Sequence, residues 1–115
     1  MFPATQEPVV PTRFAWRYGG QQVHLCGSFT RWVETVPMAP EGTPGVYSVV
    51  VHLPPGYHQY KFIVDGEWRH DEGQAFMPDP LGNVNNWLFV SRPGDAPREG
   101  DSTMAPVVGQ PGIDG

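Results

Sequence analysis

The sequence is poor in cysteine and in basic residues. Cys26 is the single cysteine, so no internal disulfide can form and an intracellular setting is expected. Lys and Arg number 7 against 12 Asp and Glu, which gives a net charge of −5. A protein that binds the phosphate backbone needs a basic surface, so we expect no nucleic-acid partner.

Long apolar runs are also missing. No segment approaches the roughly 20 consecutive apolar residues that span a bilayer. Residues 1–8 have neither the basic nor the apolar region of a secretory signal. We therefore expect a protein that is not secreted and has no membrane partner.

Patterns typical of enzymes and metal sites are absent as well. There is no GxxxxGK[ST] phosphate loop and no GxSxG elbow. Asp71 and Glu72 are adjacent carboxylates, but neighbours along a chain rarely converge on one substrate. The histidines lack paired metal-ligand spacing; they are His24, His52, His58 and His70. The prediction is a non-catalytic protein with no cofactor and no metal.

Glycine and proline are abundant instead. There are 14 of each, together roughly twice the usual share of ~12%, and both disfavour helix. Residues 1–12 are predicted to be a disordered arm, and residues 91–115 a linker or tail rich in Pro, Gly and acidic residues. Residues 13–90 hold most of the aromatic side chains and are predicted to fold as one domain.

Short alternating segments predict β-strands in this domain. Phe14, Trp16 and Tyr18 alternate with polar or small residues, and residues 46–53 form a β-branched run. Residues 33–45, with three prolines, are predicted to form a loop. Turn signals recur every 8–12 residues, which favours an all-β, antiparallel, immunoglobulin-like β-sandwich of six to eight short strands. Trp16 and Trp87 lie inside strands among apolar neighbours and are expected to belong to the core.

Asp65-Gly66 is the strongest hairpin signal in the chain. A two-residue turn pairs Ile63 with Trp68 and Lys61 with His70, and puts all four on one face. The bulky aromatic residues that alternate with Lys61 are expected in the core, so Trp68 and Lys61 should lie on the outer face. The core-facing positions of the return strand are charged, so this strand should leave the sheet quickly.

An exposed tryptophan beside a lysine suits a glucose ring, which has an apolar C–H face and a rim of hydroxyls. Trp32 ends a second turn, and Leu81, Asn83 and Asn85 are spaced two apart, so an extended segment would present them on one face. Two simpler interpretations stay open. In the first, Trp32 is a loop aromatic that packs on the core. In the second, residues 81–85 are a turn followed by an edge strand.

Four segments carry a resemblance to a known family: residues 14–16, 23–32, 58–68 and 81–86. Together they resemble the glycogen-binding domain of AMP-activated protein kinase β subunits, a family-48 carbohydrate-binding module, over about residues 13–90. Within this family, the start of the chain is most similar to the plant βγ subunit type of the sucrose-non-fermenting-1-related kinase.

The resemblance implies a β-sandwich that binds α-1,4-glucans such as glycogen or starch. It implies partnership with a kinase catalytic subunit and other regulatory subunits, in the cytoplasm or nucleus, with the plastid as an alternative. The implied sugar-contacting residues are Trp32 and Trp68 for stacking, Lys61, Leu81 as a clamp, Asn85, and Asn83 where animal subunits have threonine.

Two other functions are compatible with the sequence. The first is a protein-interaction module that docks on the kinase with weak or no sugar binding. The second is the accessory module of a starch-modifying enzyme.

Overall fold

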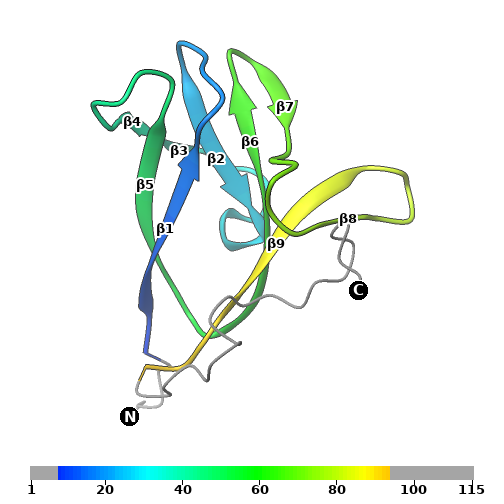
Figure 1. Ribbon diagram of the computed structural model, residues 1–115. Helices are drawn as coiled ribbons and strands as arrows, with labels where there is room; N and C mark the ends of the chain where they lie inside the picture. The colour runs from blue at the N-terminus through cyan, green and yellow to red at the C-terminus, as the bar shows by residue number, and fades with distance from the viewer. Residues whose placement is uncertain (1–7, 94–115) are drawn as a thin grey trace.

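Two antiparallel sheets pack face to face in the structure, a computed structural model that describes residues 8–93 (Figure 1). The small sheet has the order β1-β5-β4, and the large sheet has the order β3-β2-β6-β9-β8, with β7 also paired to β6. The elements are β1 (Val10–Trp16), β2 (Val23–Gly27), the 3-10 helix η1 (Ser28–Thr30), β3 (Val36–Pro37), β4 (Ala39–Pro40), β5 (Tyr47–Leu53), β6 (Gly56–Val64), β7 (Glu67–Arg69), β8 (Phe76–Pro78) and β9 (Val84–Val90).

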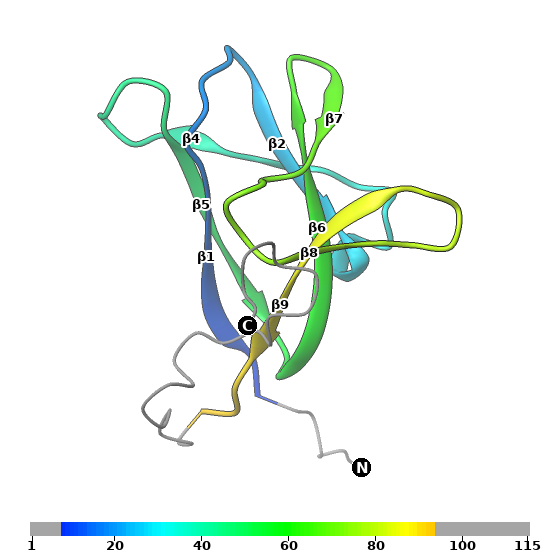
Figure 2. The same cartoon turned by 45° about the vertical axis from the view of Figure 1, so that its right-hand side comes forward.

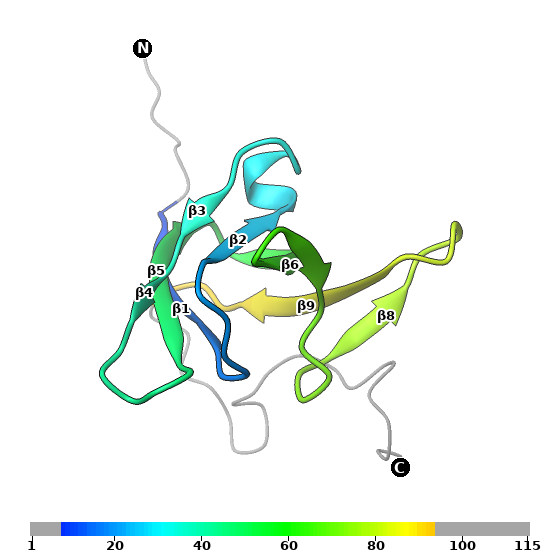
Figure 3. The ribbon, with the colours of Figure 1, turned by 90° about the horizontal axis from the view of Figure 1, so that it is seen from above.

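The predicted all-β sandwich is confirmed, and Figure 3 shows its two layers from above. The described residues form nine strands rather than six to eight, because β3 and β4, of two residues each, lie in the predicted loop 33–45. Strand β1 begins at Val10, earlier than the predicted boundary at residue 13. Residues 1–7 of the predicted arm and residues 94–115 of the predicted tail lie outside the described residues. No helix among residues 8–93 is long and apolar enough to cross a membrane.

Alternating side chains from both sheets build the core between them. Phe14 and Trp16 of β1 meet Tyr60 and Phe62 of β6, with ring centroids 4.9 Å apart in the Phe14–Tyr60 pair and again in the Trp16–Phe62 pair. The prediction that Trp16 is core is confirmed. The predicted alternation ends there, because β1 stops at Trp16 and Tyr18 is exposed.

The β6–β7 hairpin has the predicted register, with Ile63 opposite Trp68. Asp65 and Gly66 form its turn with φ of 51° and 87°, the left-handed region that such two-residue turns require. The Asp65 carboxylate also accepts hydrogen bonds from the backbone N–H groups of Gln21 and Gln22, at 2.9 and 2.8 Å. These bonds join the hairpin to the turn before β2.

Strand β7 leaves the sheet after three residues, as its charged inner positions predicted. The predicted pairing of Lys61 with His70 is wrong, because pairing with β7 ends at Arg69 opposite Phe62. On the same edge of β6, residues 56–60 pair with β9 instead. The chain between β7 and β9 leaves the sheet after β7 and returns as β8, which pairs with the far edge of β9 (Figure 2).

Asn86 fixes the loop between β7 and β8 by hydrogen bonds. Its side chain is completely buried, and its Nδ2 donates hydrogen bonds to the backbone oxygens of Asp71 (2.8 Å) and Ala75 (3.1 Å). Its Oδ1 accepts a hydrogen bond of 2.7 Å from the Asp71 N–H. One amide therefore satisfies three backbone groups of Asp71 and Ala75, which are the two buried residues of the 71–75 loop.

We predict that Asn86→Ala destabilises the domain by roughly 2–4 kcal/mol, because each buried backbone group left without a partner costs about 1–3 kcal/mol. Urea denaturation measures the loss. Asn83→Ala, which changes an exposed asparagine, is the matched control and should stay within ~0.5 kcal/mol of the parent. Equal losses in the two variants would contradict the role given to Asn86.

Candidate functional site: a concave surface between two tryptophans

A hollow of about 460 Å³ opens on the outer face of the large sheet. Five of the six predicted site residues line it, although they come from four separate segments of the chain. The sixth, Leu81, is 86% exposed at the tip of the β8–β9 loop and is not among the lining residues. The hollow is lined by Trp32, Lys61, Trp68, Asp79, Asn83 and Asn85.

Trp32 and Trp68 form the aromatic part of the hollow. Their ring centroids lie 6.4 Å apart and the ring planes are inclined by 47°. The exposed fractions are 38% for Trp32 and 50% for Trp68. The interpretation of Trp32 as an aromatic packed on the core is therefore wrong. The two rings instead offer a ligand two apolar surfaces at an angle.

The backbone at Trp32 is in a conformation that side chains rarely adopt. Arg31 and Trp32 both have a φ of 59°, in the left-handed region. Hydrogen bonds hold them there: the Trp32 N–H donates to the Gly27 carbonyl at 3.0 Å, and the Val33 N–H donates to the Thr30 carbonyl at 3.1 Å. Strain kept in place this way positions the indole over the outer face of β2 and β6.

Gly27, at the end of β2, makes this turn sterically feasible. A Cβ at Gly27 would collide with the carbonyl oxygen of Gln59 and lie 2.7 Å from the Phe29 ring. Only glycine lets η1 fold this close to β6, and η1 leads directly into Trp32.

Lys61 lies on β6 between the residues that pair with β9 and the residues that pair with β7. It faces outward opposite Cys26 of β2, and its side chain is half-buried. Within residues 8–93 its ammonium group has neither a hydrogen-bond nor a salt-bridge partner. Its three donors are therefore free for a ligand in the hollow.

The loop between β8 and β9 is organised by Asp79, which the sequence reasoning missed. The Asp79 Oδ1 accepts hydrogen bonds of 2.9 Å from the N–H groups of Leu81 and Asn83. Partial desolvation would raise the pKa of the Asp79 carboxyl, but these hydrogen bonds, with others from Asn83 and Gly82, lower it overall. An aspartate two residues before a leucine-glycine turn is a recognisable Asx-turn signal.

Asn83 and Asn85 both reach the hollow, whereas Leu81 does not share their face. The chain turns at Gly82, which has a φ of 92°, so the period of two expected for an extended segment begins only after it. The Asn85 Nδ2 donates to the Oε1 of Gln59 at 3.0 Å, and this bond orients the Asn85 side chain beside Lys61.

A second hollow of about 550 Å³ lies on the other side of Trp68. Its polar groups are largely engaged within the protein. The Tyr18 hydroxyl donates to Asp71 at 3.0 Å, which raises the pKa of Tyr18, with burial and the Asp71 charge adding to the effect. The Arg69 guanidinium lies 5.7 Å from the Trp16 ring centroid. The described part of the chain contains no group of three or more His, Cys, Asp or Glu residues arranged to hold a metal ion.

The exposed tryptophan pair and its polar rim define a carbohydrate-binding module, a non-catalytic class of domain, and sequence comparison agrees. Residues 10–96 match the family described as the glycogen recognition site of AMP-activated protein kinase. The chain belongs to this family.

Relatives with curated names are kinase β subunits. The chain is 38% identical over 96 residues to SNF1 protein kinase subunit beta-3 of Saccharomyces cerevisiae, covering 83% of this chain and 23% of that protein. It is 42% identical over 82 residues to the AMP-activated protein kinase subunit beta-1 of both Sus scrofa and Homo sapiens. That match covers 71% of this chain, and 65% of the Sus scrofa and 29% of the Homo sapiens protein. The chain thus spans less than two thirds of the length of these relatives.

We predict that Asp79→Ala loosens the β8–β9 loop without unfolding the sandwich, because Asp79 is bonded mainly within its own loop. Amide exchange at Leu81 and Asn83 should accelerate, whereas core amides of β6 should not change. Asp79→Asn retains an acceptor oxygen and should stay close to the parent. Equal exchange in Asp79→Ala and the parent would contradict the role of the carboxylate.

The same carboxylate predicts a pH dependence. The folded-state pKa of Asp79 is lowered. The stability that its ionised carboxylate gives the β8–β9 loop is therefore complete at pH values above the ordinary aspartate pKa, and it is lost as the pH falls through the lowered pKa. The Leu81 and Asn83 amide resonances should therefore titrate at a pH below the ordinary aspartate range. A midpoint above that range would contradict the assignment.

Proposed function

We propose that the Trp32–Trp68 hollow binds α-1,4-glucan chains, such as glycogen, starch or maltooligosaccharides, and that the chain is the glucan-binding module of a kinase regulatory subunit. One observation carries this proposal. Two exposed tryptophan rings, inclined by 47°, stand beside the unpaired ammonium of Lys61 and the amide of Asn85. Successive rings of an α-1,4-glucan turn relative to one another, so inclined surfaces suit such a chain better than a flat platform does.

Each site residue has a chemical role in this proposal. The two indoles stack on the apolar C–H faces of glucose rings. Lys61 donates to sugar hydroxyls, and Asn85 and Asn83 both donate and accept. Leu81, which is 86% exposed at the loop tip, gains burial by contact with a bound sugar.

Hydrolysis is not supported by the same geometry. A glycosidase uses two carboxyl groups on either side of the scissile bond, whereas among residues 8–93 Asp79 is the only carboxylate that lines this hollow. Its hydrogen bonds to backbone N–H groups lower its pKa and keep it ionised, which is unsuited to a general acid. Binding without turnover is the function that this arrangement can perform.

The partners that we propose are a kinase catalytic subunit and other regulatory subunits. The support is the family and the kinase-subunit names of the relatives. We extend the proposal to a plant βγ-type subunit on the sequence resemblance alone. An intracellular location is proposed because the single cysteine, Cys26, is buried and free. Exposed tryptophans also serve protein docking, so binding of a maltooligosaccharide at the hollow is the measurement that separates the two functions.

We predict that Trp32→Ala or Trp68→Ala weakens maltoheptaose binding by roughly 5- to 150-fold. Stacking on an aromatic plane is worth about 1–3 kcal/mol for nucleic-acid bases, and a similar order applies to glucose on tryptophan. Lys61→Ala should have a smaller effect, because an exposed polar contact nets about 0.5–1.5 kcal/mol. Isothermal titration calorimetry on the three variants measures these differences.

Thermal denaturation separates binding from folding in the same variants. Their melting temperatures should change little, since Trp32, Trp68 and Lys61 lie outside the core cluster. Trp16→Ala is the matched tryptophan control, and it should lose about 3–5 kcal/mol of stability. If Trp68→Ala binds maltoheptaose normally, the Trp32–Trp68 hollow is not the glucan site and the proposal is wrong.

A further inference from the structure

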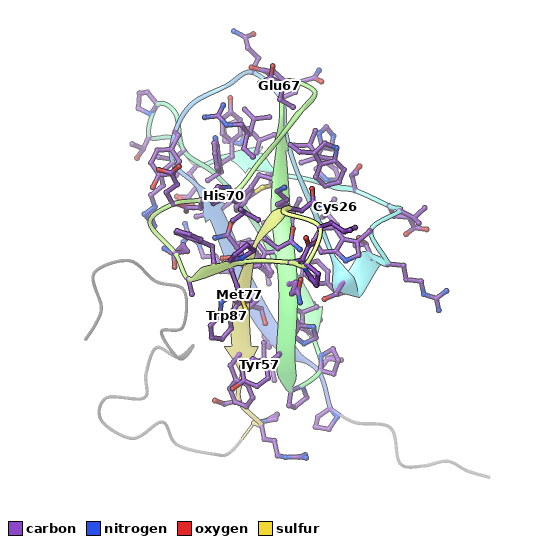
Figure 4. The ribbon with its side chains drawn as sticks, turned by 90° about the vertical axis from the view of Figure 1, so that its right-hand side faces the viewer. Cys26, Tyr57, Glu67, His70, Met77 and Trp87 are labelled. Atoms are coloured by element: carbon purple, nitrogen blue, oxygen red, sulfur yellow. The ribbon has the colours of Figure 1, made fainter. Side chains whose placement is uncertain are left out.

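Three aromatic side chains outside the proposed glucan site form a cluster on the outer face of the large sheet. Tyr57 of β6 lies between Trp87 and Phe89 of β9, with ring centroids 5.7 Å from Trp87 and 4.8 Å from Phe89. Tyr57 is 62% exposed and Phe89 is 42% exposed. Figure 4 shows Tyr57 and Trp87 on the face of the sheet that is turned toward the viewer.

The strand register puts this cluster on the same face as the glucan site. Tyr57 and Lys61 are four residues apart on β6, and residues an even number apart share a face. Tyr57 is paired with Phe89 across the two strands, as Gln59 is with Trp87. Trp87 was predicted to belong to the core; it is buried, but it lies outside the core cluster between the sheets.

A small hollow of about 200 Å³ connects the two regions. It is lined by Gln59, Met77 and Trp87 among others, and it shares Asp79 and Asn85 with the Trp32–Trp68 hollow. The outer face therefore offers one continuous surface, from the two exposed tryptophans past Asn85 and Gln59 to Tyr57 and Phe89.

The chemistry of this surface fits a neutral polyhydroxyl chain. Within the described part of the chain, Asp79 is the only charged side chain that lines the connecting hollow, and its Oδ1 accepts hydrogen bonds from loop amides. Gln59 and Asn85 present uncharged amides. The indole of Trp87 lines the hollow beside these two amides.

We propose that Tyr57 and Phe89 form a distal aromatic site that holds the same α-glucan chain as Trp32 and Trp68. This inference rests on the proposed function. Four residues of strand separate Lys61 from Tyr57 by roughly 13 Å, so a short oligosaccharide fills only the first site. A longer chain held at Trp32 and Trp68 reaches the distal site as an intramolecular contact, which strengthens its binding. The distal site thereby makes the module prefer long glucan chains.

A chain-length series with the double variant Tyr57→Ala/Phe89→Ala tests this. Both side chains are largely exposed, so the variant should fold, which its melting temperature checks. Maltotriose should bind as it does to the parent, whereas soluble amylose should bind roughly 5- to 150-fold more weakly, the range for lost aromatic stacking. Tyr57→Phe/Phe89→Tyr retains both rings and should bind amylose normally.

The outcomes separate this inference from the proposed function. Unchanged amylose binding in the double alanine variant overturns the distal site, as does an equal loss for maltotriose and amylose. A change in the sedimentation of the ligand-free protein, with amylose binding intact, would assign the cluster to contact with a second copy and also overturns the inference. Normal binding of both glucans by Trp68→Ala would instead overturn the proposed function itself.

Discussion

The site depends on one constraint: along a single edge, strand β6 pairs first with β9 and then with β7. Residues 62–64 pair with β7 and residues 56–60 pair with β9, so one strand holds both neighbours. The β7 pairing brings Trp68 to the outer face, and the β9 pairing brings Asn85 there. Lys61 lies at the junction. Asn86 makes the exchange stable, because it satisfies the backbone of the loop that leaves β7 and returns toward β8.

The two faces of the large sheet are built for different tasks. The inner face carries tightly packed aromatic rings, which supply most of the stability of a small domain without disulfides. The outer face carries aromatic rings that remain exposed, in contact with amides and one unpaired ammonium. On the outer side, the left-handed backbone at Arg31 and Trp32 is held by hydrogen bonds to Gly27 and Thr30.

Local sequence patterns predicted the parts of the site that a single hairpin controls. The Asp65-Gly66 turn set the register, so Trp68 was placed correctly on the face of Lys61 and opposite the core. The predicted Lys61–His70 pair failed because β7 leaves the sheet one residue earlier, where its charged residues would otherwise face the core. Asp79 was missed because its role is to accept hydrogen bonds from its own loop. It belongs to no sequence pattern that indicates ligand binding.

The sequence by itself determined the β class, the main turns and the face on which each strand residue lies, because strand periodicity and turn chemistry act over a few residues. It also determined the likeness to glucan-binding modules through the residues of those turns. Only the tertiary structure decided that Trp32, Trp68, Asp79 and Asn85 meet at one hollow, and that Tyr57 and Phe89 continue its surface. These side chains come from segments far apart in the chain, and their meeting depends on which strands pair with β6, which periodicity does not specify.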